Sequence, residues 1–238
     1  MLPAIEIVYP ALEALCYPPL RFGMQWSLEG LTRIPEHGPV LVASNHISYL
    51  DPFTFGVAAL IRRRRVRFLA KQELFQRREL KWILRNTRQI PVARGTASAS
   101  GSLVHAADAL RAGELVCVYP EGTISTDLDP MAGRTGTARL AQLCGVPVVP
   151  VGLWGSHRML TKRRKPHLEL GIAQTVVAGP PVTIAPDDDM YDATDRIMRA
   201  VCAAVARARA IYPQREPGAW WDRDPQDAVL QPCRREAS

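Results

Sequence analysis

Short apolar runs alternate with segments of helical periodicity along most of this chain, and this alternation restricts its fold more than any other feature. Candidate strands lie at residues 40–44, 66–70, 90–93, 115–119, 148–153, 167–170 and 174–178. Candidate helices lie at residues 52–61, 74–85, 98–112 and 194–211, and a further helix ends near Cys144. This order of elements predicts an α/β protein.

The run Val146-Pro147-Val148-Val149-Pro150-Val151 is apolar at every position. A strand with one solvated face would alternate polar and apolar residues, whereas a strand covered on both faces is apolar throughout. We therefore expect a mostly parallel central sheet flanked by helices. The chain has 238 residues and contains no repeat or interdomain linker, which fits one layered domain over residues 26–212.

Residues 1–25 form an apolar segment that is interrupted by prolines. Glu6 and Glu13 lie seven positions apart, so a helix would carry both on one polar stripe. The segment lacks the basic start of a signal peptide and is too broken for a comfortable spanning helix. Two interpretations stay open: a helical segment lying in the membrane interface, or a helix hairpin packed on the domain. Residues 213–238 are polar and predict a mobile tail.

Basic residues are concentrated in two parts of the chain. Residues 62–94 contain twelve Arg or Lys and two Glu, and Lys162-Arg163-Arg164-Lys165 forms a second cluster. Such clusters suit an anionic partner, which could be nucleic acid, anionic lipid or a phosphorylated substrate. The five cysteines are widely spaced and show no zinc-binding pattern, which is typical of reduced thiols in a cytoplasmic protein. No metal-ligand set or cofactor motif is evident.

An imidazole and a carboxylate follow the first strand of the predicted sheet, in the pattern Asn45-His46-x-x-x-x-Asp51. A histidine can accept a proton near neutral pH, and a carboxylate can hold the ring in one tautomer. Asp51 precedes Pro52, so the carboxylate could equally act as the N-cap of the next helix. The pattern predicts a general base at a strand-to-helix corner, with helix capping as the alternative role for Asp51.

Other polar residues end neighbouring strands. Lys71 follows the strand at 66–70, Arg94 follows that at 90–93, and the turn Pro120-Glu121-Gly122-Thr123 follows that at 115–119. Cations at such ends can hold phosphate, and glycine lets an anion approach the backbone closely. Open α/β sheets bind ligands at the carboxyl ends of their strands. Together with His46 and Asp51, these residues predict a phosphate-binding catalytic site.

In their order and content these motifs resemble the glycerolipid acyltransferases of the PlsC type, the 1-acylglycerol-3-phosphate O-acyltransferases. The resemblance covers about residues 26–180, and its four blocks are Asn45-His46-x-x-x-x-Asp51, Ile90-Pro91-Val92-Ala93-Arg94-Gly95, Tyr119-Pro120-Glu121-Gly122-Thr123 and the run at 146–151. It implies transfer of an acyl chain from acyl-CoA or an acyl carrier protein to a lysophospholipid hydroxyl, giving phosphatidic acid when the acceptor is 1-acylglycerol-3-phosphate.

The resemblance implies catalysis by His46 and Asp51, without a cofactor or metal. It also implies substrate binding by a larger group of residues, namely Asn45, Lys71, Arg94, Glu121, Gly122 and Thr123. One departure concerns Ile124, because the family usually has an arginine there that helps to hold phosphate. Arg134 is the candidate replacement. We expect the enzyme at the cytoplasmic face of the cell membrane, held peripherally or monotopically on an anionic surface.

Three alternatives remain. Within the same class, the acceptor could be another lysolipid, such as a glycolipid or ornithine lipid intermediate. A non-catalytic membrane-binding relative is disfavoured, because the His46 and Asp51 pair is intact. A nucleic-acid binder is disfavoured, because no basic motif interleaved with aromatic residues is present.

Overall fold

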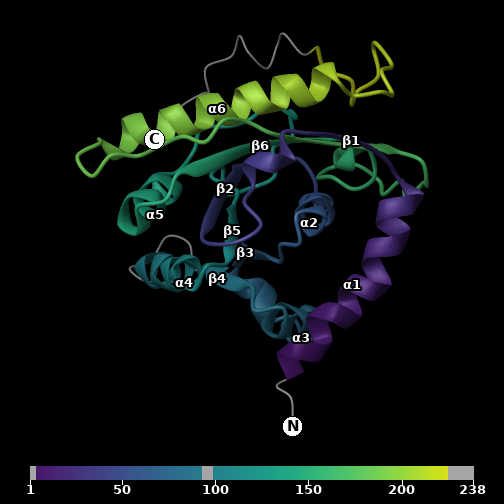
Figure 1. The fold of residues 1–238 in the computed structure, drawn as a ribbon. Coiled ribbons are helices and arrows are strands. Elements are labelled where there is room, and N and C mark those ends of the chain that lie inside the picture. Colours follow the sequence, from purple (N-terminus) through teal and green to yellow (C-terminus); the bar gives the residue numbers. More distant parts are fainter. Residues whose placement is uncertain (1–3, 93–98, 225–238) are drawn as a thin grey trace.

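The computed structural model describes residues 4–92 and 99–224 of the chain, drawn in colour in Figure 1. The helices are α1 (Ala4–Gly23), α2 (Asp51–Ile61), α3 (Arg78–Asn86), α4 (Ala99–Arg111), α5 (Gly136–Cys144) and α6 (Met190–Ala210). The strands are β1 (Gln25–Glu29), β2 (Val40–Ser44), β3 (Val66–Lys71), β4 (Ile90–Val92), β5 (Leu115–Val118), β6 (Val148–Trp154) and β7 (Ala173–Ala178). Short 3₁₀ turns lie at η1 (Leu31–Arg33), η2 (Gln72–Phe75) and η3 (Ser156–Arg158).

The strands form one seven-stranded sheet in the order β1-β7-β6-β2-β5-β3-β4. Every neighbouring pair is parallel except β6 and β7, which pair antiparallel. The α/β fold with a mostly parallel sheet is therefore confirmed. β2 lies between β5 and β6, so the residues that follow β2 emerge at the middle of the sheet.

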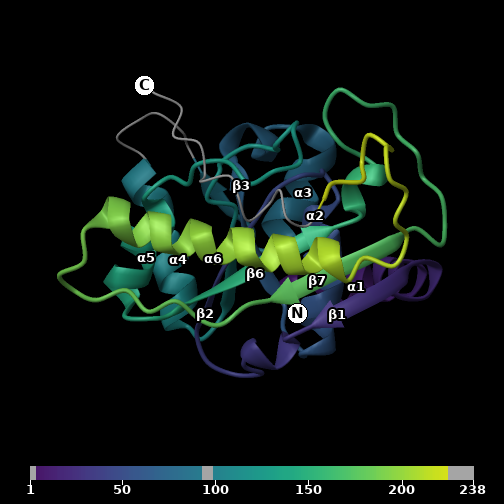
Figure 2. The ribbon, with the colours of Figure 1, turned by 90° about the horizontal axis from the view of Figure 1, so that it is seen from above.

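Helices cover both faces of this sheet (Figures 1 and 2). Along β2, Leu41 and Ala43 point into a core shared with α4, α5 and α6, whereas Val40 and Val42 point into a core shared with α2. All five residues of β2 are buried. This two-sided burial explains why β2, β5 and β6 are apolar at nearly every position.

The structure differs from the predicted elements in three places. Residues 167–170 form an exposed loop, because their leucines face solvent and no neighbouring strand pairs with them. The predicted helix at 74–85 is divided into η2 and α3, since Arg77 has extended backbone angles. β1 was not predicted. It is a half-buried strand at the sheet edge, parallel to β7, and lacks the continuous apolar pattern of the central strands.

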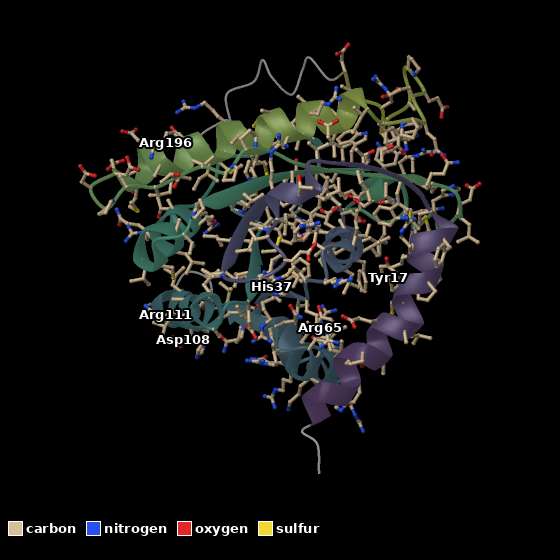
Figure 3. All side chains as sticks on the ribbon, in the orientation of Figure 1. Tyr17, His37, Arg65, Asp108, Arg111 and Arg196 are labelled. Carbon is tan, nitrogen blue, oxygen red and sulfur yellow. The ribbon has the colours of Figure 1, made fainter. Side chains whose placement is uncertain are left out.

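The N-terminal segment forms the single helix α1 and not a hairpin, so the hairpin interpretation is wrong. Its polar side chains attach it to the domain: the Tyr9 hydroxyl accepts a 3.2 Å hydrogen bond from the amide of Val66, and Glu13 pairs with Arg65 at 2.9 Å. Figure 3 labels Arg65 on the side of the domain next to α1. Among the described residues, no helix combines the length and the apolarity that crossing a membrane requires. Membrane association of residues 1–25 stays a prediction.

The first part of the predicted polar tail packs on the domain. Trp221 lies in a buried cluster with Trp154 and Tyr212. Gln214 accepts a 3.0 Å hydrogen bond from the amide of Ala173, which joins this segment to β7. The expectation of a mobile tail beginning at residue 213 is therefore wrong up to Trp221, while residues 225–238 lie outside the described part of the chain.

Candidate active site

The carboxyl ends of β2, β5 and β6 lie side by side, because the three strands are parallel neighbours. His46 follows β2 by two residues, Tyr119 follows β5 directly, and Ser156 follows β6 by two residues. Parallel pairing thus collects side chains that are up to 110 positions apart in sequence, as Ser156 and His46 are. This is the edge at which open α/β sheets bind ligands.

His46 and Asp51 form a hydrogen-bonded pair, with 2.9 Å between His46 Nδ1 and Asp51 Oδ2. The Asp51 side chain is fully buried, whereas that of His46 is 18% exposed. Oδ2 also accepts hydrogen bonds from the amides of Ile47 at 2.7 Å and Ser48 at 2.8 Å, and Oδ1 accepts one of 2.6 Å from Ser156 Oγ. Asp51 is therefore an acceptor at both oxygens.

The carboxylate of Asp51 determines which ring nitrogen of His46 carries the proton. Because a carboxylate can only accept, Nδ1 of His46 must carry the proton that joins the pair, and the neutral ring then has its lone pair on Nε2. Nε2 is then the ring atom that can accept a proton. The hydrogen-bonded pair of His46 and Asp51 is thus present in the structure, and its role as a base with an orienting carboxylate stays a prediction.

The alternative role of Asp51 as a helix cap does not fit the structure. α2 begins at Asp51 itself, its N-cap residue is Leu50, and no side chain caps the helix there. The carboxylate binds amides three and four residues before it, in the turn after β2. Asp51 therefore holds that turn and the His46 ring, and it does not cap α2.

The ring of Tyr119 lies flat against the His46 imidazole. The two ring centroids are 4.1 Å apart and the planes differ by 16°. Stacking on one side and a hydrogen bond at Nδ1 leave the imidazole little freedom to rotate. Burial, followed by the nearby Cys117 and Asp51, raises the pKa of Tyr119 well above its usual value of 10. The phenol is neutral, and its buried hydroxyl has no hydrogen-bond partner in the described part of the chain.

The Glu121 side chain binds the backbone of the site. Its side chain is buried, Oε1 accepts a 2.9 Å hydrogen bond from the amide of His46, and Oε2 accepts one of 3.1 Å from the amide of Met131. The carboxylate joins the turn after β2 to the loop after β5. This geometry gives Glu121 a structural role in place of the direct substrate contact that the sequence predicted.

Asn45 is likewise turned inward. Its Nδ2 donates a 3.1 Å hydrogen bond to the carbonyl of Leu153, and its Oδ1 accepts one of 2.7 Å from the Leu153 amide. With these two bonds the Asn45 side chain pairs with the backbone of β6 as a neighbouring strand would. It is fully buried. Direct substrate contact by Asn45 does not fit this position, which instead sets where His46 leaves the sheet.

The turn at Gly122 gathers two cationic side chains. Gly122 has a φ of +72°, and a Cβ atom there would lie 3.0 Å from Nε of Arg134. Arg134 thus packs over the glycine, and its amide donates to the carbonyl of Pro120 at 2.9 Å. From the loop after η3, Lys162 Nζ donates to Thr123 Oγ1 at 2.5 Å and to the carbonyl of Ile124 at 3.1 Å.

Two predicted residues remain, Lys71 and Arg94, and the structure describes only Lys71. Lys71 ends β3 with an exposed side chain, and β3 pairs directly with β5. Arg94 follows β4 but lies outside the described residues, as do Ala93 and Gly95. The structure therefore brings Lys71, Arg134 and the turn at 121–123 to the same edge as His46 and leaves the prediction for Arg94 open.

The sequence did not identify Ser156 and Lys162 as residues of this site, nor did it predict the contact of the Tyr119 ring with His46. A signal was available for Ser156, since it follows a predicted strand just as His46 does. Lys162 was visible only as part of a basic cluster, because its contact with Thr123 joins residues 39 positions apart. No short spacing encodes that contact.

Comparisons with known proteins find that the chain is similar to acyltransferases. A family model described as "Acyltransferase" matches residues 25–154, more than half of the chain. A 1-acyl-sn-glycerol-3-phosphate acyltransferase of Bacillus subtilis is 29% identical over 140 residues, which are 58% of this chain and 68% of the relative. The chloroplastic 1-acyl-sn-glycerol-3-phosphate acyltransferase LPAT1 of Arabidopsis thaliana is 27% identical over 156 residues. These are 65% of this chain but 43% of that longer protein.

A solved structure has the same fold. The crystal structure of the 1-acyl-sn-glycerophosphate (LPA) acyltransferase PlsC from Thermotoga maritima superposes with a TM-score of 0.69 at 22% identity. The superposition covers 90% of this chain and 86% of the PlsC chain. The family match extends from β1 to the end of β6 and so includes the His46 and Asp51 pair and the turn at Gly122. With this site at the strand ends and a family model that spans it, the chain belongs to the acyltransferase family.

Proposed function

We propose that this protein transfers a fatty acyl chain from acyl-CoA or an acyl carrier protein to the free hydroxyl of 1-acylglycerol-3-phosphate, which yields phosphatidic acid. The observation that carries the proposal is the paired His46 and Asp51, with Nε2 of the ring left to accept a proton. Two relatives named as acyltransferases of this acceptor support the choice of substrate.

The pairing of His46 with Asp51 supports the following reaction. Nε2 of His46 removes the hydroxyl proton as the acceptor oxygen attacks the thioester carbonyl. The tetrahedral intermediate then collapses, the carbon–sulfur bond breaks, and the leaving thiolate recovers the proton from His46. Asp51 holds the ring in the required tautomer and stabilises the imidazolium between the two steps. The chain supplies the base and the orientation, and no covalent acyl-enzyme is needed.

The acceptor phosphate is proposed to lie near the turn after β5. Arg134 packs over Gly122 there, Lys162 reaches Thr123, and Lys71 ends the neighbouring β3. Ile124 is buried and cannot supply a charge, but Lys162 binds its carbonyl oxygen and so places an ammonium at that position of the turn. These cations favour a phosphorylated acceptor over an uncharged glycolipid.

We also propose that the protein works at the cytoplasmic face of the cell membrane, bound peripherally or monotopically, because both substrates of this reaction class are lipids or carry a lipid chain. The exposed Phe22 of α1 and the basic side chains of α3 support this proposal. An anionic bilayer would attract the excess of positive charge, and the apolar side chains would enter its interface.

The test is acyl transfer from labelled acyl-CoA to lysophosphatidic acid by the purified chain, alongside a panel of other lysolipids and an acyl carrier protein donor. His46→Ala should lower kcat by about 10²- to 10⁴-fold. His105→Ala, which removes an exposed histidine of α4, is the matched control. Wild-type rates in His46→Ala would remove His46 as the base, and a better rate with a glycolipid or ornithine lipid acceptor would reassign the substrate.

A further inference from the structure

One loop beside the active site combines exposed leucines with a cluster of positive charge. We define the basic loop as residues 161–171, between η3 and β7. The side chains of Leu168 and Leu170 are 73% and 72% exposed. Isolated exposed leucines are common on proteins, but two in one protruding loop next to another large apolar side chain are characteristic of an interaction surface.

That other side chain is Phe22, which is 80% exposed at the end of α1. The amide of Gly171 donates a 2.7 Å hydrogen bond to the carbonyl of Gly23, and Leu170 lies against Gly23 with only 3.0 Å to the position a Cβ would occupy. The basic loop therefore lies directly beside the carboxyl end of α1, as Figures 1 and 2 both show.

The charges around these apolar residues are mostly positive. The basic loop holds four basic residues, Lys162, Arg163, Arg164 and Lys165, and one acidic residue, Glu169, so its formal charge is 4 − 1 = +3. Arg21 adds a cation in the last turn of α1. Arg164 stacks over the ring of Trp220 at 4.3 Å, which places an amphipathic aromatic residue at the same surface.

The loop begins at the active site. Thr161 Oγ1 donates a 2.6 Å hydrogen bond to the carbonyl of Ile47, next to His46, and the amide of Tyr49 donates to the carbonyl of Leu160 at 3.2 Å. Lys162 then contacts Thr123. The basic loop therefore runs from the segment that holds His46, at its first residues, to the carboxyl end of α1, at Gly171.

We infer that the basic loop and the carboxyl end of α1 form one docking surface for an anionic lipid bilayer, which presents the acceptor lipid to His46. Leu168, Leu170 and Phe22 enter the interface while the three outer cations, Arg163 to Lys165, meet anionic headgroups. A nucleic acid would bind the cations but would leave the exposed leucines without an apolar environment to enter. The inference rests on the proposed function for its purpose, but vesicle binding can be measured without any acyl transfer.

The first test is flotation of the full chain with vesicles of phosphatidylcholine alone or mixed with phosphatidylglycerol. Each basic residue near an anionic surface strengthens binding about five-fold, so the triple variant Arg163→Gln/Arg164→Gln/Lys165→Gln should bind the mixed vesicles about 10²-fold more weakly. Lys162 is kept, because it contacts Thr123. The matched control is Arg111→Gln/Arg139→Gln/Arg199→Gln, which removes the same charge from α4, α5 and α6.

The apolar part of the surface is tested with Leu168→Ser/Leu170→Ser. This pair should weaken binding to both kinds of vesicle by about ten-fold or more. Val104→Ser/Leu143→Ser is the control, because it removes two exposed apolar side chains from α4 and α5. Wild-type vesicle binding by both loop variants would overturn the inference, as would loop variants that lose retention on DNA while still binding vesicles.

Activity separates this inference from the proposed function. The loop variants should lose transfer to an acceptor embedded in mixed vesicles but keep the wild-type rate on a short-chain acceptor dissolved as monomers. Loss on both acceptors would overturn the docking role. A wild-type chain that binds mixed vesicles through the loop but transfers no acyl group would instead overturn the proposed function alone.

Discussion

Ser156 Oγ donates a 2.6 Å hydrogen bond to Oδ1 of Asp51, from a position 105 residues further along the chain. The Ser48 hydroxyl shares its one proton between the carbonyls of Leu160 at 2.6 Å and Ser156 at 3.1 Å, which joins the turn after β2 to the segment that holds Ser156. Both serines are fully buried. The carboxylate that binds His46 is thus held from the segments that follow two strands of the sheet, β2 and β6, and its direction does not depend on the local turn alone.

Ser156→Ala should therefore slow the chemical step without weakening substrate binding. A hydrogen bond to a charged group contributes about 1.5–3 kcal/mol, so kcat should fall by about 10- to 100-fold while KM for the acceptor stays near its wild-type value. Steady-state kinetics with varied acceptor measure both constants. Ser102→Ala, which removes another buried serine on α4, is the control. An unchanged kcat in Ser156→Ala would show that Asp51 needs no support from β6.

The two parts of the Tyr119 side chain have opposite effects. Its ring stacks on His46, but its buried hydroxyl has no partner among the described residues. Tyr119→Phe keeps the ring and removes the unsatisfied group, so it should raise the free energy of unfolding by about 1 kcal/mol and leave kcat unchanged. Urea unfolding and kinetics are the measurements.

Tyr119→Leu tests the ring. Aromatic pairs contribute about 0.5–1.5 kcal/mol, so loss of the stack should lower kcat by up to about ten-fold. The prediction compares the two variants: equal rates for Tyr119→Phe and Tyr119→Leu would mean that the ring does not hold His46.

Gly122→Ala should displace Arg134 and strain the turn. The φ of +72° costs an L-residue about 1 kcal/mol, and the added methyl group would meet Arg134 at 3.0 Å. We expect lower stability and a higher KM for a phosphorylated acceptor. Gly38→Ala is the matched control, since Gly38 has a φ of +81° with nothing within 4 Å of the new Cβ. Equal KM values for the two variants would remove Arg134 from the phosphate site.

His157 should make stability depend on pH. Burial lowers its pKa in the folded protein to about 4, although the carbonyl of Trp221 and the charge of Asp51 oppose the shift. Between its unfolded value of about 6.5 and about 4, only the unfolded chain binds the proton, so stability is lost as pH falls through this window and is complete above it.

From about pH 7 to about pH 5, His157 should account for a loss of about 2 kcal/mol in the free energy of unfolding. Urea unfolding of wild type and His157→Gln at both pH values measures the difference, because all other groups titrate alike in the two proteins. His105→Gln replaces an exposed histidine and should behave as wild type. The same loss in His157→Gln as in wild type would contradict the assignment.

Much of the fold could be predicted because its central strands carry their own signal. β2 was predicted with its observed bounds, and β5 and β6 to within one residue, since burial on both faces makes them apolar throughout. The errors fall where burial is partial. β1 and residues 167–170 have similar mixed patterns, yet only β1 has a partner strand, and the presence of a partner is a tertiary fact.

The site divides in the same way. His46 and Asp51 were predicted from one short motif, and their contact spans five positions within a single turn. The inward orientation of Asn45 and Glu121 could not be predicted, because each binds backbone atoms of another segment, 108 and 75 positions away. The sequence of a motif does not indicate whether a polar side chain in it faces the substrate or the core.

The sequence by itself determined that this is an α/β protein and that a histidine and a carboxylate lie close together after its central strand, since both follow from apolar periodicity and local spacing. Only the tertiary structure decided that Ser156 supports Asp51, that Tyr119 holds the ring of His46, and that Lys162 takes a place beside Ile124. The reason is physical: parallel strands bring their carboxyl ends together across long stretches of chain, and which side chains meet there depends on strand order and register.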